Sequence, residues 1–207
     1  RQKRGNIDLT VKESQITINE KGVIDIKPRT SVTAYKIIEE FMICANETVA
    51  EFIYNLDLPF VYRVHEKPSE EKLNAFMNFI NALGINVKWS VDTCHPKDFQ
   101  NLLESLKGES VYSIVNKVML RSMQKAKYFT ENIGHFGLSS KCYCHFTSPI
   151  RRYPDLTVHA VLKGVLSGSF DFDYFDGYVQ TVAEISSEKE RLADEVERDT
   201  DDLYKCK

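Results

Sequence analysis

The sequence lacks a long hydrophobic run. No apolar stretch reaches the roughly 18 residues that a membrane-spanning helix needs, and no charged-then-apolar leader precedes a cleavage site. We therefore expect a soluble protein with no membrane partner. Cysteine is also sparse: the five residues are an odd number without the spacing of a disulfide framework, which favours free thiols in a reducing compartment. The expected location is the cytoplasm.

Internal repeats and low-complexity segments are absent as well. The 207 residues are 43% hydrophobic, enough for a real core in one large domain or two small ones. The chain starts at Arg1 without a methionine and ends at Lys207 inside a charged helical pattern. We expect it to be a piece of a longer protein.

An excess of positive charge is missing too, since the net charge is −3. The distribution is uneven, however. Residues 116–163 carry eight Lys/Arg against two acidic side chains, whereas residues 171–202 carry twelve acidic side chains against three basic ones. The basic segment favours a polyanionic partner, although a charge run is more often a solvated face.

Hydrophobic periodicity predicts a helix-rich α+β fold, with short mixed or antiparallel strands packed against several helices. Helices are expected at residues 31–56, 69–83, 96–106, 110–123, 154–166 and from 175 to the end. Strands are expected at residues 15–19 and 23–27 as a hairpin, and at 58–65, 85–89 and 139–147. The helix over residues 31–56 is predicted to be a core helix.

The segment HFTSPIRRYPDL, residues 145–156, carries the clearest chemistry. Ser148 followed by Pro149 is typical of a helix N-cap, which exposes backbone N–H groups to an anion. Arg151 and Arg152 follow at once, so a hydroxyl and two guanidinium groups converge where a phosphate would bind. The alternative is an exposed helix start whose arginines form surface salt bridges.

Acidic side chains on two helices are less decisive. Glu39 and Glu40 lie beside apolar neighbours, where an acid has either a structural arginine partner or a place in a site. A row that contains Glu190 and Glu197 recurs at helical spacing, and such rows are mostly solvated or face a basic surface.

A zinc site is conceivable but poorly supported. Four possible ligands lie close in sequence: His135, Cys142, Cys144 and His145. A second closely spaced ligand pair is missing, so we do not expect zinc here.

Several motifs in order resemble the catalytic RNB domain of the ribonuclease II and ribonuclease R family. They are RGNID, AYKIIEEFMICAN, PFVYRVHEKP, LRSMQKAKY, GHFGL, HFTSPIRRYPDL and ERD, which together span nearly the whole chain. The resemblance implies processive 3′-to-5′ hydrolysis of single-stranded RNA to 5′-mononucleotides, with magnesium (Mg²⁺) in a closed channel.

The resemblance also implies roles for individual residues. Arg151 matches the arginine that grips the scissile phosphate. Glu39 matches a residue that contacts the 3′-terminal nucleotide, and Glu197 matches a further acid of the active site. Ser148 and Arg152 are expected to contact RNA from the same segment. Leu9 stands where several bacterial members place a stacking aromatic, so half of that clamp is weakened.

One part of the family pattern is absent: no aspartate-rich cluster of the kind that binds the metal precedes residue 30. We expect residues 1–207 to form the C-terminal part of an RNB domain, with the metal ligands and the cold-shock and S1 modules outside this chain. Such a chain should be inactive alone and should expose an apolar surface where the rest of the domain packs. The alternative is an RNA-binding or scaffold unit of a degenerate, non-catalytic homologue. The oligomeric state stays open.

Overall fold

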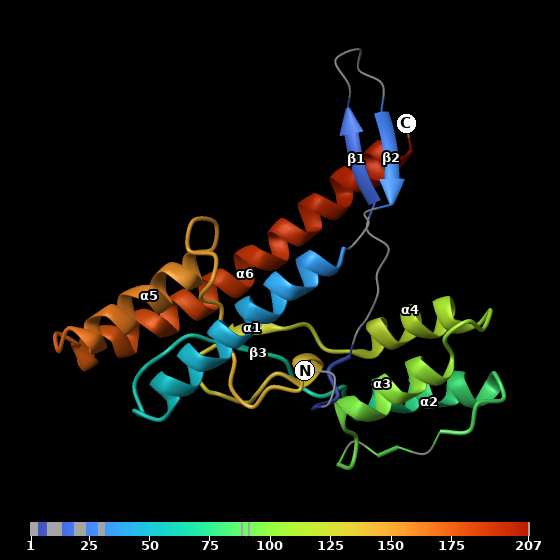
Figure 1. Cartoon of the computed structure of the whole chain (residues 1–207), viewed down its shortest axis with the longest axis horizontal. Helices are drawn as coiled ribbons and strands as arrows, with labels where there is room; N and C mark the ends of the chain where they lie inside the picture. Colours follow the sequence, from blue (N-terminus) through green and yellow to red (C-terminus); the bar gives the residue numbers. More distant parts are fainter. Residues whose placement is uncertain are drawn as a thin grey trace.

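The structure, a computed structural model, contains six α-helices and two small antiparallel sheets in the part of the chain that it describes (Figure 1). The described residues are 4–7, 14–18, 24–28, 32–87, 89–90 and 92–206. The expected helix-rich α+β class is confirmed. No helix within these ranges has the combination of length and apolar character that a membrane span requires.

The first sheet is the expected hairpin, shifted by about one residue. Strands β1 (Ser14–Ile18) and β2 (Ile24–Pro28) pair antiparallel, with Ile16 opposite Ile26. The strands lie at the same end of the molecule as the C-terminus (Figure 1).

Three helices enclose a first hydrophobic core, which we call the bundle core. They are α2 (Glu70–Ala82), α3 (Pro96–Ser105) and α4 (Tyr112–Ser122). Their starts follow from local chemistry, since Ser69 caps α2 and a capping box of His95 and Asp98 opens α3. The largest buried side chains of this core are Leu73, Phe76, Ile80, Phe99 and Met119.

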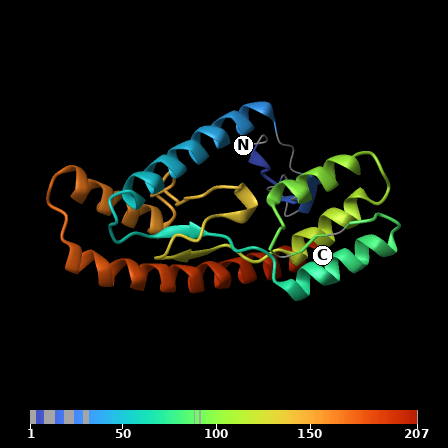
Figure 2. The same ribbon diagram turned by 90° about the horizontal axis from the view of Figure 1, so that it is seen from below.

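A second hydrophobic core, the strand core, surrounds strands β3 (Tyr62–Val64) and β4 (Lys127–Phe129), which pair antiparallel. Helices α1 (Thr33–Tyr54) and α6 (Phe172–Lys205) lie on opposite sides of these strands (Figure 2), and α5 (Tyr153–Leu166) packs on α6. Buried members of this core include Ile53, Phe60, Val61, Val64, Val158, Val161 and Val179.

Helix α6 is tied to the strands by polar contacts. The Ser187 hydroxyl accepts a hydrogen bond from the Tyr128 N–H at 2.9 Å and donates to the Tyr128 carbonyl at 3.1 Å. Arg63 of β3 forms an ion pair with Glu190. A 34-residue helix is thereby held along the short sheet.

Helix α1 is a core helix only in its second half, which corrects the expectation for its first half. Ile43, Asn46, Ala50 and Ile53 are buried. The apolar side chains of the first half are solvent-exposed, namely Tyr35, Ile37, Ile38, Phe41 and Met42. An apolar surface is therefore exposed, as expected for part of a larger domain.

Two expected strands are wrong. Residues 85–87 and 89 form no strand, and residues 139–147 form none either. In the second segment the Tyr143 carbonyl accepts a hydrogen bond from the Arg63 N–H at 2.9 Å, and Ser140 forms an isolated bridge with His135. Residues 139–147 thus run beside β3 as an irregular segment. Strand β4 was not predicted.

Candidate nucleic-acid interface

The arginine pair lies at a tight turn and not inside a helix. The Ser148 carbonyl accepts hydrogen bonds from the backbone N–H groups of Arg151 at 3.2 Å and Arg152 at 3.1 Å. Helix α5 begins only at Tyr153, with Arg152 in the N-cap position. The expectation that Ser148 caps a helix is therefore wrong. Arg152 has extended backbone, and Pro154 lies in the first turn of α5, where its missing N–H would have no intrahelical partner.

A buried carboxylate holds this turn in place. Oδ2 of Asp155 accepts a hydrogen bond from the Ser148 N–H at 2.7 Å and another from Nη2 of Arg152 at 2.8 Å. The Asp155 side chain is completely buried, and the Arg152 side chain is 21% exposed. The charge of Arg152, a residue expected to contact RNA, is thus paired inside the protein with Asp155.

The Arg151 side chain is placed quite differently. It is exposed and forms no ion pair with any residue in the described ranges. The preceding Ile150 is 98% exposed, so no residue in the described part of the chain covers the tip of the turn. The turn therefore presents one uncommitted guanidinium group from a rigid base.

The wall behind the turn contains a neutral histidine. Burial, and then the positive charges of Arg152 and Arg63, lower the pKa of His145 to about 2. Its Nδ1 lies 2.9 Å from the Tyr128 hydroxyl, whose pKa burial raises to about 12. The guanidinium of Arg63 stacks 4.6 Å from the centre of the Tyr128 ring. The His145 and Tyr128 side chains of this wall are uncharged, and the charge of Arg63 is paired with Glu190.

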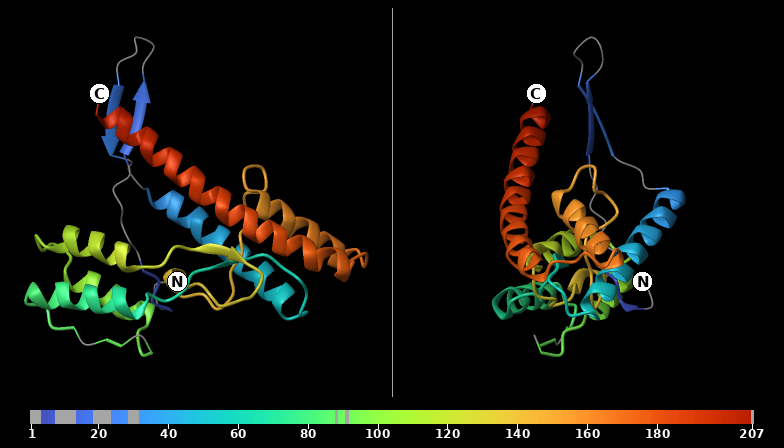
Figure 3. Two further views of the ribbon diagram at one scale, coloured as in Figure 1. Left: turned by 180° about the vertical axis from the view of Figure 1, so that it is seen from behind. Right: turned by 90° about the vertical axis from the view of Figure 1, so that its left-hand side faces the viewer.

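The two acids named from the resemblance lie on the flanking helices. Glu39 is exposed in the first half of α1, and Glu197 is exposed in the last third of α6. The orange loop that precedes α5 stands between α1 and α6 (Figure 3, right). The structure thus places Arg151, Glu39 and Glu197 on three elements that border one side of the molecule.

Sequence reasoning missed the residue that links α1 to this site. Asn46 is 3% exposed, its side-chain N–H donates to the Tyr143 hydroxyl at 3.0 Å, and its Oδ1 accepts from the Phe146 N–H at 3.0 Å. The Cys144 thiol donates to its carbonyl at 3.2 Å. The available signal was an amide on the apolar face of a helix, which requires a buried partner.

Metal ligands do not assemble in this part of the protein. Within the described ranges, no group of three or more His, Cys, Asp or Glu side chains is close enough to hold an ion. The Cys142 thiol is buried, which raises its pKa to about 12, and Nδ1 of His145 faces Tyr128. The described residues therefore do not fit a magnesium site.

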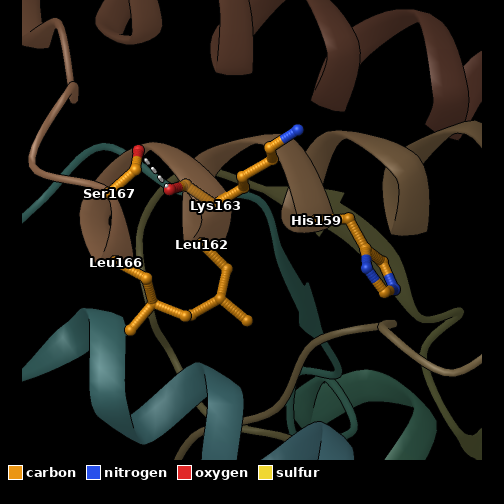
Figure 4. Close-up of a pocket in the computed structure, with 5 residues that line it drawn as sticks. All are labelled: His159, Leu162, Lys163, Leu166 and Ser167. Carbon is orange, nitrogen blue, oxygen red and sulfur yellow. Dashed lines mark hydrogen bonds between the residues drawn. The ribbon is translucent and has the colours of Figure 1, made fainter.

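A shallow hollow beside α5 is lined by residues of that helix and of its C-terminal end (Figure 4). Nε2 of His159 lies 2.9 Å from the Phe146 carbonyl, and the Ser167 hydroxyl donates to the Lys163 carbonyl at 2.8 Å. Leu162 and Leu166 point toward the neighbouring helix. We assign no role to this hollow.

Comparison with known proteins places these features in a family. Residues 1–168 match the family model described as "RNB domain". The chain belongs to the RNB family. It is 47% identical to ribonuclease R of Thermotoga maritima over 206 residues, which cover 96% of this chain and 29% of that protein.

Solved structures of RNB family members agree with this assignment. Mycoplasma genitalium RNase R in complex with ribose-methylated single-stranded RNA matches with a TM-score of 0.92 and 33% identity, over 99% of this chain and 33% of that one. The same protein in complex with double-stranded RNA matches with a TM-score of 0.93 and 33% identity, over 99% of this chain and 37% of that one.

A more distant RNB-like structure is yeast Ssd1, described as a pseudonuclease. It matches with a TM-score of 0.62 and 25% identity, over 76% of this chain and 21% of that one. The chain thus spans about a third or less of the relatives it matches. It is homologous to ribonuclease R over a part of that protein. Leu9, the expected stacking position, lies outside the described residues.

Proposed function

We propose that this chain is part of a 3′-to-5′ exoribonuclease that hydrolyses single-stranded RNA processively to 5′-mononucleotides. The observation that carries the proposal is the contrast between the two arginines of the turn. Arg152 is committed to the buried Asp155, whereas Arg151 is exposed and has no ion pair among the described residues. A guanidinium held ready on a rigid turn suits the negative charge of a phosphate.

Arg151 acts in this proposal by preorganisation. The Asp155 carboxylate fixes the Ser148 N–H, and the Ser148 carbonyl fixes the Arg151 N–H, so the backbone below Arg151 needs little rearrangement. The guanidinium of Arg151 is then already in place when negative charge develops on the scissile phosphate. It therefore lowers the activation barrier of hydrolysis more than it strengthens RNA binding. Arg151 is the catalytic residue, and Arg152 positions it.

The other predicted residues have binding roles. Glu39 of α1 is proposed to contact the 3′-terminal nucleotide, since carboxylates accept hydrogen bonds from ribose hydroxyls, and Glu197 of α6 is proposed as a further acid of the active site that binds RNA. Ser148 contributes to RNA binding through its place in the turn. Two of the solved relatives are RNase R complexes with RNA, which supports RNA as the partner.

The magnesium ion is proposed to lie in the longer protein. Since the described residues do not fit such a site, its ligands are aspartates of a preceding segment, and residues 1–207 are the C-terminal part of the domain. Cold-shock and S1 modules complete the parent protein. The chain alone is expected to be inactive. Five free cysteines support a cytoplasmic location.

A second candidate is an RNA-binding unit of a non-catalytic homologue. The match to a pseudonuclease favours it. The two candidates differ in one measurement, the release of mononucleotides from labelled single-stranded RNA by the longer protein with Mg²⁺.

The test of the proposal compares Arg151→Lys with Arg152→Lys in that longer protein. Lysine keeps the charge of Arg151 but loses the planar fork, so kcat should fall about 10²- to 10³-fold with RNA affinity nearly unchanged. Arg152→Lys should lower kcat much less. Equal small losses, or an Arg151 effect on affinity alone, would remove Arg151 from the catalytic role.

A further inference from the structure

A second concave site lies in the bundle half of the molecule. Its volume is about 420 Å³, and α2, α4 and the 3₁₀ turn η2 (Phe136–Leu138) contribute to its walls. Helix α4 lies at the opposite end of the molecule from α5 in the ribbon views (Figures 1 and 2). The pocket is therefore separate from the turn that carries Arg151.

The charged side chains of this pocket are all cationic. Lys72 of α2, Arg121 of α4 and Lys125 just beyond α4 line it, and its lining in the described chain includes no carboxylate. None of the three forms an ion pair with any described residue. Three uncompensated positive charges around one pocket repel one another, so an anion that binds there stabilises the arrangement.

Two stacked imidazoles form another wall of the pocket. The rings of His65 and His135 lie 5.1 Å apart at an interplanar angle of 22°. Nδ1 of His65 accepts a hydrogen bond from the Gly137 N–H at 2.9 Å, and its Nε2 lies 2.8 Å from the Gln124 carbonyl. Both nitrogens of His65 are thus used to shape the site.

The second histidine of this wall, His135, has a ring N–H donor on Nε2. Its Nδ1 accepts a hydrogen bond from the Leu138 N–H at 3.2 Å, which places the ring proton of the neutral form on Nε2. Burial first, and then the neighbouring His65, lower the pKa of His135 to about 3. The ring also forms a hydrogen bond to the backbone of His135 itself, and in the described part of the chain Nε2 has no partner in any other residue.

We infer that this pocket binds the phosphate group of a nucleotide. Lys72, Arg121 and Lys125 supply the charge, His135 supplies a neutral N–H donor, and the apolar side chains of Ile7, Leu120 and Met123 offer a surface for a base or ribose. The volume suits a single nucleotide. The phosphate follows from the lining alone, whereas the choice of a nucleotide rests on the proposed function.

The experiment uses the 207-residue chain labelled with ¹⁵N and follows the backbone amides of Gly137 and Leu138 by NMR. Four probes are titrated: uridine 5′-monophosphate, uridine, inorganic phosphate, and a uridine pentanucleotide with both ends unphosphorylated. The pocket variant is Arg121→Gln with Lys125→Gln. The control is Lys117→Gln with Lys107→Gln, which removes the same charge at positions outside the pocket lining.

Saturable shifts with the monophosphate but not with uridine support the inference, and they identify a free mononucleotide as the ligand. Shifts of the same amides with the pentanucleotide alone also support it, and they identify a phosphate of the RNA chain. The pocket variant should weaken binding about tenfold for each cation removed, whereas the control should retain it.

Three results would overturn the inference: no shift with any phosphate-bearing probe, equal response to uridine and its monophosphate, or equal weakening by the control variant. None of them bears on the kinetics of Arg151 variants in the longer protein. Conversely, Arg151→Gln should leave the shifts at Gly137 and Leu138 unchanged. The failure of one proposal is thus distinguishable from the failure of the other.

Discussion

Asp155 forms a buried ion pair with Arg152. Its Oδ2 lies 2.8 Å from Nη2 of Arg152, and the carboxylate is completely buried. The same oxygen accepts the Ser148 N–H. Oδ1 of Asp155 and Nε of Arg152 are buried without a hydrogen-bond partner in the structure. Arg152 therefore has a structural partner inside the protein, whereas Arg151 is the arginine that we propose acts on the scissile phosphate.

This division predicts unequal effects on stability. Arg152→Ala leaves the Asp155 carboxylate buried without its counter-charge and should lower the free energy of unfolding by about 3 to 5 kcal/mol. Arg151→Ala, at an exposed position, should change it by less than about 0.5 kcal/mol. Urea denaturation of the 207-residue chain followed by circular dichroism measures both. Equal losses would contradict the assignment.

The exposure of the first half of α1 predicts that Phe41 contributes far less to stability than the buried Phe60. Phe60 is completely buried, so Phe60→Ala should cost about 3 to 5 kcal/mol. Phe41 is 69% exposed, so Phe41→Ala should cost less than about 0.5 kcal/mol. Phe41→Ala should instead reduce the binding of an apolar fluorescent dye, because it shrinks the exposed patch. Dye binding that is unchanged by this substitution would show that the first half of α1 is covered.

The buried histidines predict acid lability. The pKa of His145 is about 2 in the folded chain, against 6.5 for an unperturbed histidine. Between these values the unfolded state binds more protons, so the stabilising contribution is complete above pH 6.5 and is lost as the pH falls toward 2. Each pH unit within this window costs about 1.4 kcal/mol.

The measurement is urea denaturation between pH 7.5 and 5. His145→Gln should reduce the dependence of stability on pH by about one proton, and His135→Gln should act similarly, because the pKa of His135 is lowered to about 3. An unchanged pH dependence in both variants would show that neither imidazole is kept neutral by the fold.

The ion pair between Glu190 of α6 and Arg63 of β3 predicts a further effect on stability. Glu190 is 32% exposed and pairs with Arg63, which is only 13% exposed. Glu190→Gln should lower the free energy of unfolding by about 1.5 to 3 kcal/mol, the range for hydrogen bonds to charged groups. Glu188→Gln is the matched control, since Glu188 is 67% exposed and, among the described residues, its ion pair is with the neighbouring Lys189 at 3.6 Å. Similar losses for both would indicate a general charge effect.

The sequence predicted correctly those helices and strands that are marked by a local pattern of residues. The hairpin and the helices have clear periodicity, and Ser69 and Pro96 mark helix starts that the structure confirms. It failed for residues 139–147, where Cys142, Tyr143 and Cys144 are all buried. A segment that is buried on both sides does not show the alternation of apolar and polar residues that marks a half-buried strand. The strand-like composition of residues 139–147 was therefore misleading.

The sequence shows which residues of the candidate site lie in one segment, but it does not show how their side chains are arranged. The spacing of Ser148, Arg151 and Arg152 indicated a phosphate site, whereas the exchange of roles between the arginines depends on Asp155, which a sequence pattern shows only as an acid in a first helical turn. The first half of α1 has the periodicity of a core helix because that pattern records which side chains require burial. It does not record whether their cover lies in the same chain.

The position of the bundle between β3 and β4 has a consequence for the order of folding. Tyr62 pairs with Phe129 across more than sixty intervening residues, and closing a flexible loop of that length costs several kcal/mol of chain entropy. Once α2, α3 and α4 have packed around Phe76 and Phe99, the ends of that loop are already held near each other. The strand pair then becomes a short-range contact. Amide protection should accordingly appear in α2 and α4 before it appears in β3 and β4.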